Sequence, residues 1–260
     1  MKRLVLALLL LAGCGDDSQQ AAPDAPGIDA PADAPTPIDA AEICLTPIDD
    51  ANRGHKVIWL NYEGVVLTHC TGPTGSSSCP DPTMNTTNIV VPDGGTVPPF
   101  NETLQNRQAY LDLVTEKVRD EMANYDVDIV TTRPASGDYT EIAFGGICPE
   151  VTGNLMCPNG TSSIGLRACF MPWAPLIALV FDTTNSSTYA ANAAMFDIGT
   201  MAGLSPVNMP GNCVSLTSIS DTTPCTFNRN APLIPDAACP GTALIEDQLS
   251  VLKAKIGCRR

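Results

Sequence analysis

The chain has 260 residues, and its 28 acidic side chains against 14 lysines and arginines give a formal net charge of −14 at pH 7. A chain this acidic repels a phosphate backbone, and it shows no basic patch interleaved with aromatic residues, so the composition excludes a nucleic-acid-binding protein. Residues 15–50 hold nine of the acids and no lysine or arginine, which leaves 19 acids and 12 bases, a net charge of −7, for residues 51–260.

Residues 1–13 have the pattern of a signal peptide. Lys2 and Arg3 precede an apolar run from Leu4 to Leu11, which is too short to span a bilayer. The sequence Leu-Ala-Gly-Cys that ends at Cys14 resembles the lipobox of bacterial lipoproteins. This resemblance implies that Cys14 carries lipid, palmitate included, and anchors the protein in the cell envelope. Gly15 carries no obvious inner-membrane retention signal, so the outer membrane is favoured; ordinary secretion with Cys14 removed or unmodified is the alternative.

Residues 14–50 are predicted to form a lipidated cysteine followed by a disordered tether. The near-repeats DAPGIDAPADAPTPIDA contain little apolar surface to bury, and their prolines favour extended polyproline stretches. Residues 51–260 are then expected to form one folded domain with a substantial core.

Eleven cysteines in a secreted chain predict disulfide bonds. Ten candidates remain once Cys14 is set aside for lipid: Cys44, Cys70, Cys79, Cys148, Cys157, Cys169, Cys213, Cys225, Cys239 and Cys258. Most of the connectivity cannot be deduced, but Cys70 with Cys79 and Cys148 with Cys157 are plausible short-range pairs. Zinc bound by cysteines is the competing interpretation, and no CxxC pair supports it.

The order of predicted elements favours an α+β fold. Strand formers alternate in residues 56–62, and this strand is expected to continue past Gly64 into residues 65–67, before a long loop or small insertion over 71–100. Apolar residues three and four apart predict an amphipathic helix over 103–124. The remaining predictions are strands over 126–132, 139–144 and 176–181, a helix over 187–202 and a last helix over 244–256.

The helix over 187–202 leads into the sequence FDIGTMAGLSP, residues 196–206, which resembles the HExxHxxGxxH zinc motif of metzincin metallopeptidases with Gly203 at the motif glycine. The resemblance implies that the three histidine positions are held by Phe196, Thr200 and Pro206, and the general-base position by Asp197. A catalytic zinc needs about three protein ligands and an open position for water. We therefore predict neither a metal site nor a cofactor here. The alternative is an ordinary core helix that Gly203 ends.

His55 and His69 are the only histidines in the chain, which excludes a three-histidine site anywhere in it. Both are expected to be surface or hydrogen-bonded histidines at strand edges.

Further segments extend the resemblance over residues 56–257. VIWLNYEGV, NYDVDIVTTRPASGDYTEIAFGG and DQLSVLKAKIG look like segments of secreted metzincin-like proteins from myxobacteria and their relatives. The resemblance implies a zincin-like mixed sheet with a long helix, a motif helix and a C-terminal helix, stapled by disulfides.

Three hypotheses for function follow. The first is a lipid-anchored, catalytically silent protease homologue whose old cleft, lined by Phe196, Thr200 and Met201, binds a peptide or an envelope protein. The second is an active peptidase or other hydrolase with a site rebuilt around Asp197. An acid and base pair drawn from Glu141, Asp182 and Asp197 belongs to the same class. The third is a structural spacer in the envelope.

Overall fold

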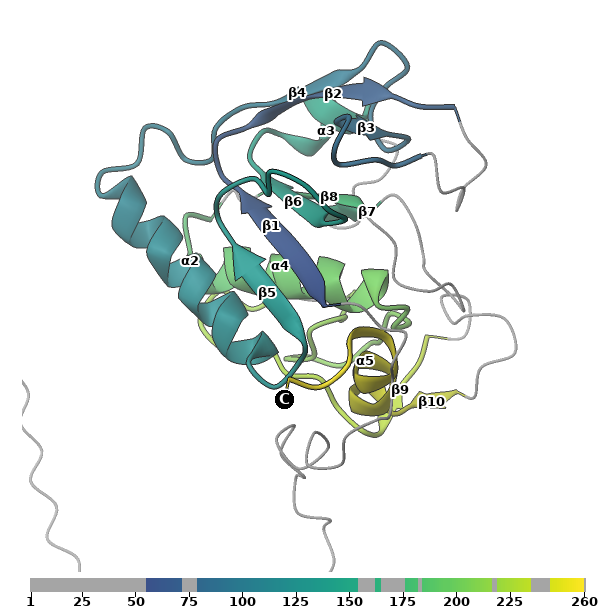
Figure 1. Cartoon of the computed structure of the whole chain (residues 1–260). Coiled ribbons are helices and arrows are strands. Elements are labelled where there is room, and N and C mark those ends of the chain that lie inside the picture. Colours follow the sequence, from purple (N-terminus) through teal and green to yellow (C-terminus); the bar gives the residue numbers. More distant parts are fainter. Residues whose placement is uncertain are drawn as a thin grey trace, which may run out of the picture. The chain divides into compact units, whose positions relative to one another are not determined.

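The computed structural model describes residues 55–71, 79–153, 162–164, 176–181, 184–216, 219–234 and 244–259, all of which belong to one compact unit, Ile38–Arg260. The fold is α+β, as predicted (Figure 1). The strands are β1 (Lys56–Asn61), β2 (Val65–His69), β3 (Thr86–Thr87), β4 (Gly95–Val97), β5 (Val127–Val130), β6 (Thr140–Phe144), β7 (Ser162–Ile164), β8 (Ile177–Val180), β9 (Ala231–Pro232) and β10 (Ile245–Glu246). The helices are α2 (Arg107–Met122), α3 (Cys148–Thr152), α4 (Ser187–Met201) and α5 (Gln248–Ile256).

The main sheet has five strands in the order β5-β1-β6-β8-β7. The first four are parallel, and β7 pairs antiparallel with β8 at one edge. Ile58 in β1 lies between Ile129 of β5 and Thr140 of β6, which fixes the register at the centre. The sequence of β8, IALV, is buried at every position, as expected for a parallel strand covered on both faces.

The two faces of this sheet support two separate clusters of apolar side chains. Ile142 and Phe144 of β6 join the cluster that includes α2 and α4, whereas Ala143 between them joins the cluster under β2, β4 and α3. This split follows from the strand period of two, because successive side chains point to opposite faces. The helices α2 and α4 also pack directly on each other (Figure 1).

The amphipathic helix predicted over 103–124 is present as α2, and it buries an apolar stripe formed by Tyr110, Leu111, Val114, Val118 and Met122. It begins later than expected because Asn106 has a left-handed backbone conformation, φ 64°, which helical residues do not adopt. None of the helices in the described part of the chain is long and apolar enough to cross a bilayer.

The prediction that the first strand continues past Gly64 is wrong. Gly64 has φ +79°, and a Cβ there would lie 2.6 Å from the carbonyl oxygen of Val97, so the chain turns sharply at a position that requires glycine. Beyond the turn, β2 leaves the main sheet and joins a separate sheet of order β3-β2-β4. The predicted loop over 71–100 contributes the two short outer strands.

The last predicted helix begins four residues later than expected. Asp247 accepts a hydrogen bond from the Ser250 amide at 3.1 Å and caps α5, while Ile245–Glu246 pairs with β9. Gly257, with φ 90°, follows the last helical residue, so the predicted end of the helix is confirmed.

Two disulfides join cysteines within the described residues. Cys70–Cys79, predicted from spacing, is confirmed, and Cys213–Cys225 closes a second short loop. Cys148 and Cys258 are also disulfide-bonded. The predicted partner of Cys148, Cys157, lies outside the described residues, as do three further disulfide candidates, Cys44, Cys169 and Cys239, and the predicted lipid-attachment residue Cys14.

Candidate functional site

The motif helix α4 follows β8 and lies inside the domain. Its N-terminus is capped by Ser186, whose Oγ accepts from the Tyr189 amide at 3.2 Å. Every residue from Tyr189 to Met201 is buried, because the helix packs between α2, the sheet and the chain that follows it. The predicted helix over 187–202 is therefore confirmed as an element, and its surroundings are those of a core helix.

The residues at the motif's ligand positions face the core. The exposed fractions of Phe196 and Thr200 are 4% and 2%, and Pro206 is also buried. The Thr200 hydroxyl lies 3.0 Å from both the Phe196 and Asp197 carbonyl oxygens, so its proton is directed back to its own helix. Met201, predicted to line a cleft with Phe196 and Thr200, is 2% exposed. These side chains are not accessible to a ligand in this structure.

Asp197 is fully buried, and neither of its carboxylate oxygens has a hydrogen-bond partner in the structure as described. Burial raises the pKa of Asp197 well above its usual value. The protonated form is therefore favoured, and a protonated acid cannot act as a general base.

Two glycines define the end and the packing of α4. Gly203 has φ 93°, and its amide donates to the Thr200 carbonyl at 3.0 Å, so it ends the helix in a left-handed conformation. At Gly199 a Cβ would lie 2.6 Å from the side chain of Val214, which shows how closely the following chain covers the helix. Both observations match the core-helix interpretation of the motif.

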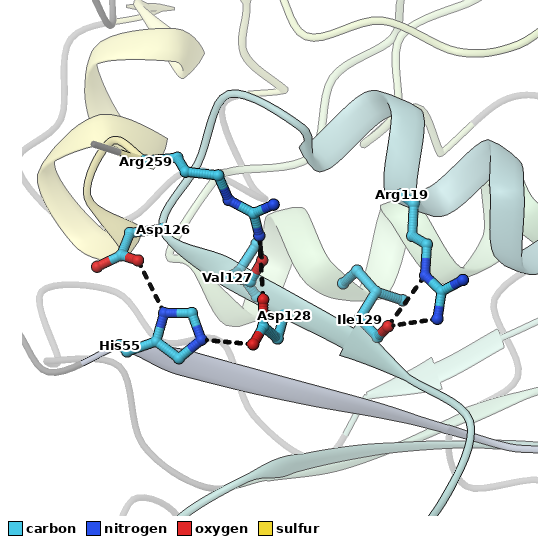
Figure 2. Close-up of polar contacts among 7 residues, drawn as sticks. All are labelled: His55, Arg119, Asp126, Val127, Asp128, Ile129 and Arg259. Atoms are coloured by element: carbon cyan, nitrogen blue, oxygen red, sulfur yellow. Dashed lines mark hydrogen bonds and ion pairs between the residues drawn. The ribbon is translucent and has the colours of Figure 1, made fainter.

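The two histidines lie away from α4, at the ends of strands, as expected. His69 Nδ1 is 2.9 Å from the Val90 carbonyl oxygen. His55 lies between two carboxylates, with Nδ1 2.8 Å from Asp126 and Nε2 2.9 Å from Asp128 (Figure 2). These hydrogen bonds, the one to Asp126 first, raise the pKa of His55 above its usual value. Across the described ranges, no group of three His, Cys, Asp or Glu side chains is placed to hold a metal ion.

Glu141 is the other buried acid that the sequence offered as a catalytic candidate. It is 0% exposed, and its Oε1 accepts from Asn61 Nδ2 at 2.7 Å. Burial raises the pKa of Glu141 to about 7, against the smaller opposing effects of that hydrogen bond and of Arg133.

Glu141 and Asp197 do not form an acid and base pair. Glu141 precedes Ile142 in β6 and therefore points to the face opposite the α4 cluster, so the sheet separates the two carboxyl groups. The third candidate, Asp182, lies outside the described residues.

Cavities on the described surface include two along α2, neither of which is lined by α4. One of about 510 Å³ lies along α2 beside Tyr62 and Glu63, and another of about 340 Å³ lies between α2, β5 and Arg259. Neither cavity was predicted from the sequence, because the position of each depends on which helix packs at the edge of the main sheet.

Comparison with known proteins adds no family assignment. No protein-family model matches the chain, and a search of curated proteins finds no significant match.

Proposed function

We propose that this chain is a bacterial cell-envelope lipoprotein whose folded domain derives from a zincin-type metallopeptidase and no longer catalyses hydrolysis. The N-terminal signal, the lipobox-like Cys14 and the acidic tether support the anchored location.

The arrangement of elements supports the proposed ancestry. Between β1 and β5 the chain forms the small sheet β3-β2-β4 and then α2. The next strands add on the other side of β1, and the motif helix α4 follows β8. This is the order that the resemblance to zincins implies, with the altered motif in the expected helix.

The observation that carries the loss of catalysis is the environment of Asp197. A zinc protease needs a water nucleophile whose pKa a metal ion lowers from about 15.7 to about 7, which corresponds to about 12 kcal/mol of activation. The ligand positions hold Phe196, Pro206 and Thr200, whose hydroxyl donates to a carbonyl of its own helix. The base position holds Asp197, a buried acid whose carboxylate oxygens have no hydrogen-bond partner in the structure as described.

Two of the three hypotheses are non-catalytic, a binding protein and a structural spacer, and of these we propose binding of a peptide or an envelope protein. Because Phe196, Thr200 and Met201 are buried, we propose that the partner contacts the surface of the domain and not the motif side chains.

Peptide hydrolysis by the purified chain from residue 15 onward, before and after chelation and zinc addition, tests this function. We expect no cleavage above the buffer rate in any state, and the same result for Asp197→Ala. Cleavage that zinc restores after chelation, or that Asp197→Ala abolishes, would contradict the proposal.

A further inference from the structure

The edge strand β5 carries a feature that is independent of the motif helix. In the order β5-β1-β6-β8-β7 only one side of β5 is paired within the sheet. A strand edge exposes backbone donors and acceptors that can pair with another chain, so proteins use specific devices to protect such edges.

The register shows which backbone groups point outward. Lys56 donates from its amide to the Asp126 carbonyl at 3.2 Å, and it pairs with Val127. In a parallel ladder alternate residues bond to the neighbour, so the backbone groups of Val127 and Ile129 face away from β1. These two residues form the outer edge of β5.

Both outward carbonyls accept hydrogen bonds from arginine side chains. Arg119 of α2 donates to the Ile129 oxygen from Nε at 3.1 Å and from Nη2 at 2.9 Å. Arg259 Nη2 donates to the Val127 oxygen. Figure 2 shows the two guanidinium groups reaching the strand from different elements, α2 and the C-terminal segment.

Arg259 is held in place from two directions. Its backbone amide donates to the Asn124 carbonyl at 3.1 Å, and its Nη2 lies 3.1 Å from Asp128 Oδ1. The other oxygen of Asp128 is 2.9 Å from His55 Nε2 (Figure 2). The side chain is thus oriented along the edge although it is half exposed.

We propose that Arg119 and Arg259, the edge arginines, close β5 against strand pairing with a second copy of this chain. A charged donor forms a stronger hydrogen bond to a carbonyl than a neutral amide does. A β5 strand from another molecule would have to displace both guanidinium groups to pair with these oxygens. The cavity of about 340 Å³ beside the strand is lined by both arginines, so their removal leaves space at the edge as well as free acceptors.

The test uses the chain from residue 15 onward, which contains the whole compact unit Ile38–Arg260. Arg119→Met with Arg259→Met keeps the apolar stems and removes the donors. Lys117→Met with Lys253→Met removes the same charge from α2 and α5 and serves as the control. Light scattering over a range of protein concentrations gives the mass, and hydrogen exchange follows the Ile129 amide.

We expect the edge variant to associate, with a mass of roughly twice the control value or more, as edge-to-edge pairing requires. The Ile129 amide should become protected in the associated species, because it then donates to the other copy. A folded edge variant with the control's mass overturns the proposal, and so does association that leaves Ile129 exchange unchanged. If the double variant does not fold, the single variants decide by the same criteria, since each opens one carbonyl. If neither single variant folds, the two arginines are required for folding, and the proposal is likewise overturned.

Discussion

At the scale of single residues, the surroundings of Asp197 distinguish a core helix from a hydrolytic site rebuilt around this residue. A carboxyl group without partners in a core favours its protonated form, and the cost of ionising it opposes folding as pH rises. The raised pKa of Asp197 therefore contributes stability below the unfolded-state pKa, and this stability is lost as pH rises toward the folded-state pKa.

Asp197→Asn removes that ionisation with almost no change of shape. We expect the free energy of unfolding to be close to that of the original chain at pH 4 and higher than it at pH 8, as urea denaturation at both values would show. Asp112→Asn, on the exposed face of α2, is the control and should have little effect. A variant that is less stable than the original chain at pH 8 would indicate a charged partner for Asp197.

Glu141→Gln tests the second buried acid. The pKa of Glu141 is about 7 in the folded chain, against a usual value of 4.5. The free energy of unfolding therefore falls as pH rises from 4.5 to 7, by about 3 kcal/mol at 1.36 kcal/mol per pKa unit. The glutamine retains an oxygen for Asn61 Nδ2, so the variant should be more stable than the original chain at pH 8 by about this amount. Equal stability of the two chains at pH 8, measured by urea denaturation, would show that Glu141 ionises there without cost.

At the scale of elements, the sequence predicted most helices and strands but not how they meet. The stripe from Tyr110 to Met122 identified α2, because helix periodicity depends on neighbours in sequence. The turn at Gly64 was missed, since it is imposed by the approach of residues 97–99, more than thirty positions away. For α4 the sequence left a core helix and a helix lining a cleft as alternatives, and it could not choose between them because the cover of α4 comes partly from Val214 and Phe227.

Gly199→Ala measures the close packing of α4. Alanine favours a helix by about 1 kcal/mol over glycine, but its Cβ would lie 2.6 Å from Val214 Cγ1 and 3.0 Å from Phe227 Cε1. Overpacking costs about 1 to 3 kcal/mol, so after the helix gain we expect a net loss of up to about 2 kcal/mol in thermal or urea denaturation.

The pairing of Gly199→Ala with Val214→Ala isolates the cause of that loss. In the Val214→Ala background, Gly199→Ala should lower the free energy of unfolding by less than it does in the original chain, because the smaller side chain at position 214 relieves the contact. A stabilising Gly199→Ala would mean that the covering chain moves away at little cost.

At the scale of the whole molecule, folding shifts the pKa values of four carboxyl groups and of His55 in the same direction. The pKa values of His55, Glu121, Glu141, Asp197 and Glu246 are all raised. Each group binds its proton more tightly in the folded chain, so each contributes stability that is present at low pH and lost as pH rises.

We therefore expect the free energy of unfolding to fall as pH is raised from about 4.5 to 8, with the carboxyl groups acting first and His55 above its unfolded-state value of about 6.5. Urea denaturation across this range measures it. In the Glu141→Gln variant the fall should be shallower between pH 4.5 and 7. A stability maximum above pH 8 would contradict these assignments.

The central proposal is that residues 196–206, which resemble a zinc-binding motif, serve as the end of a core helix and hold no metal. Calorimetric titration of the purified chain from residue 15 with zinc, followed by metal analysis after dialysis, tests this most directly. We predict no stoichiometric zinc binding by the original chain and none by Asp197→Ala. Retention of one zinc per chain that Asp197→Ala abolishes would contradict it.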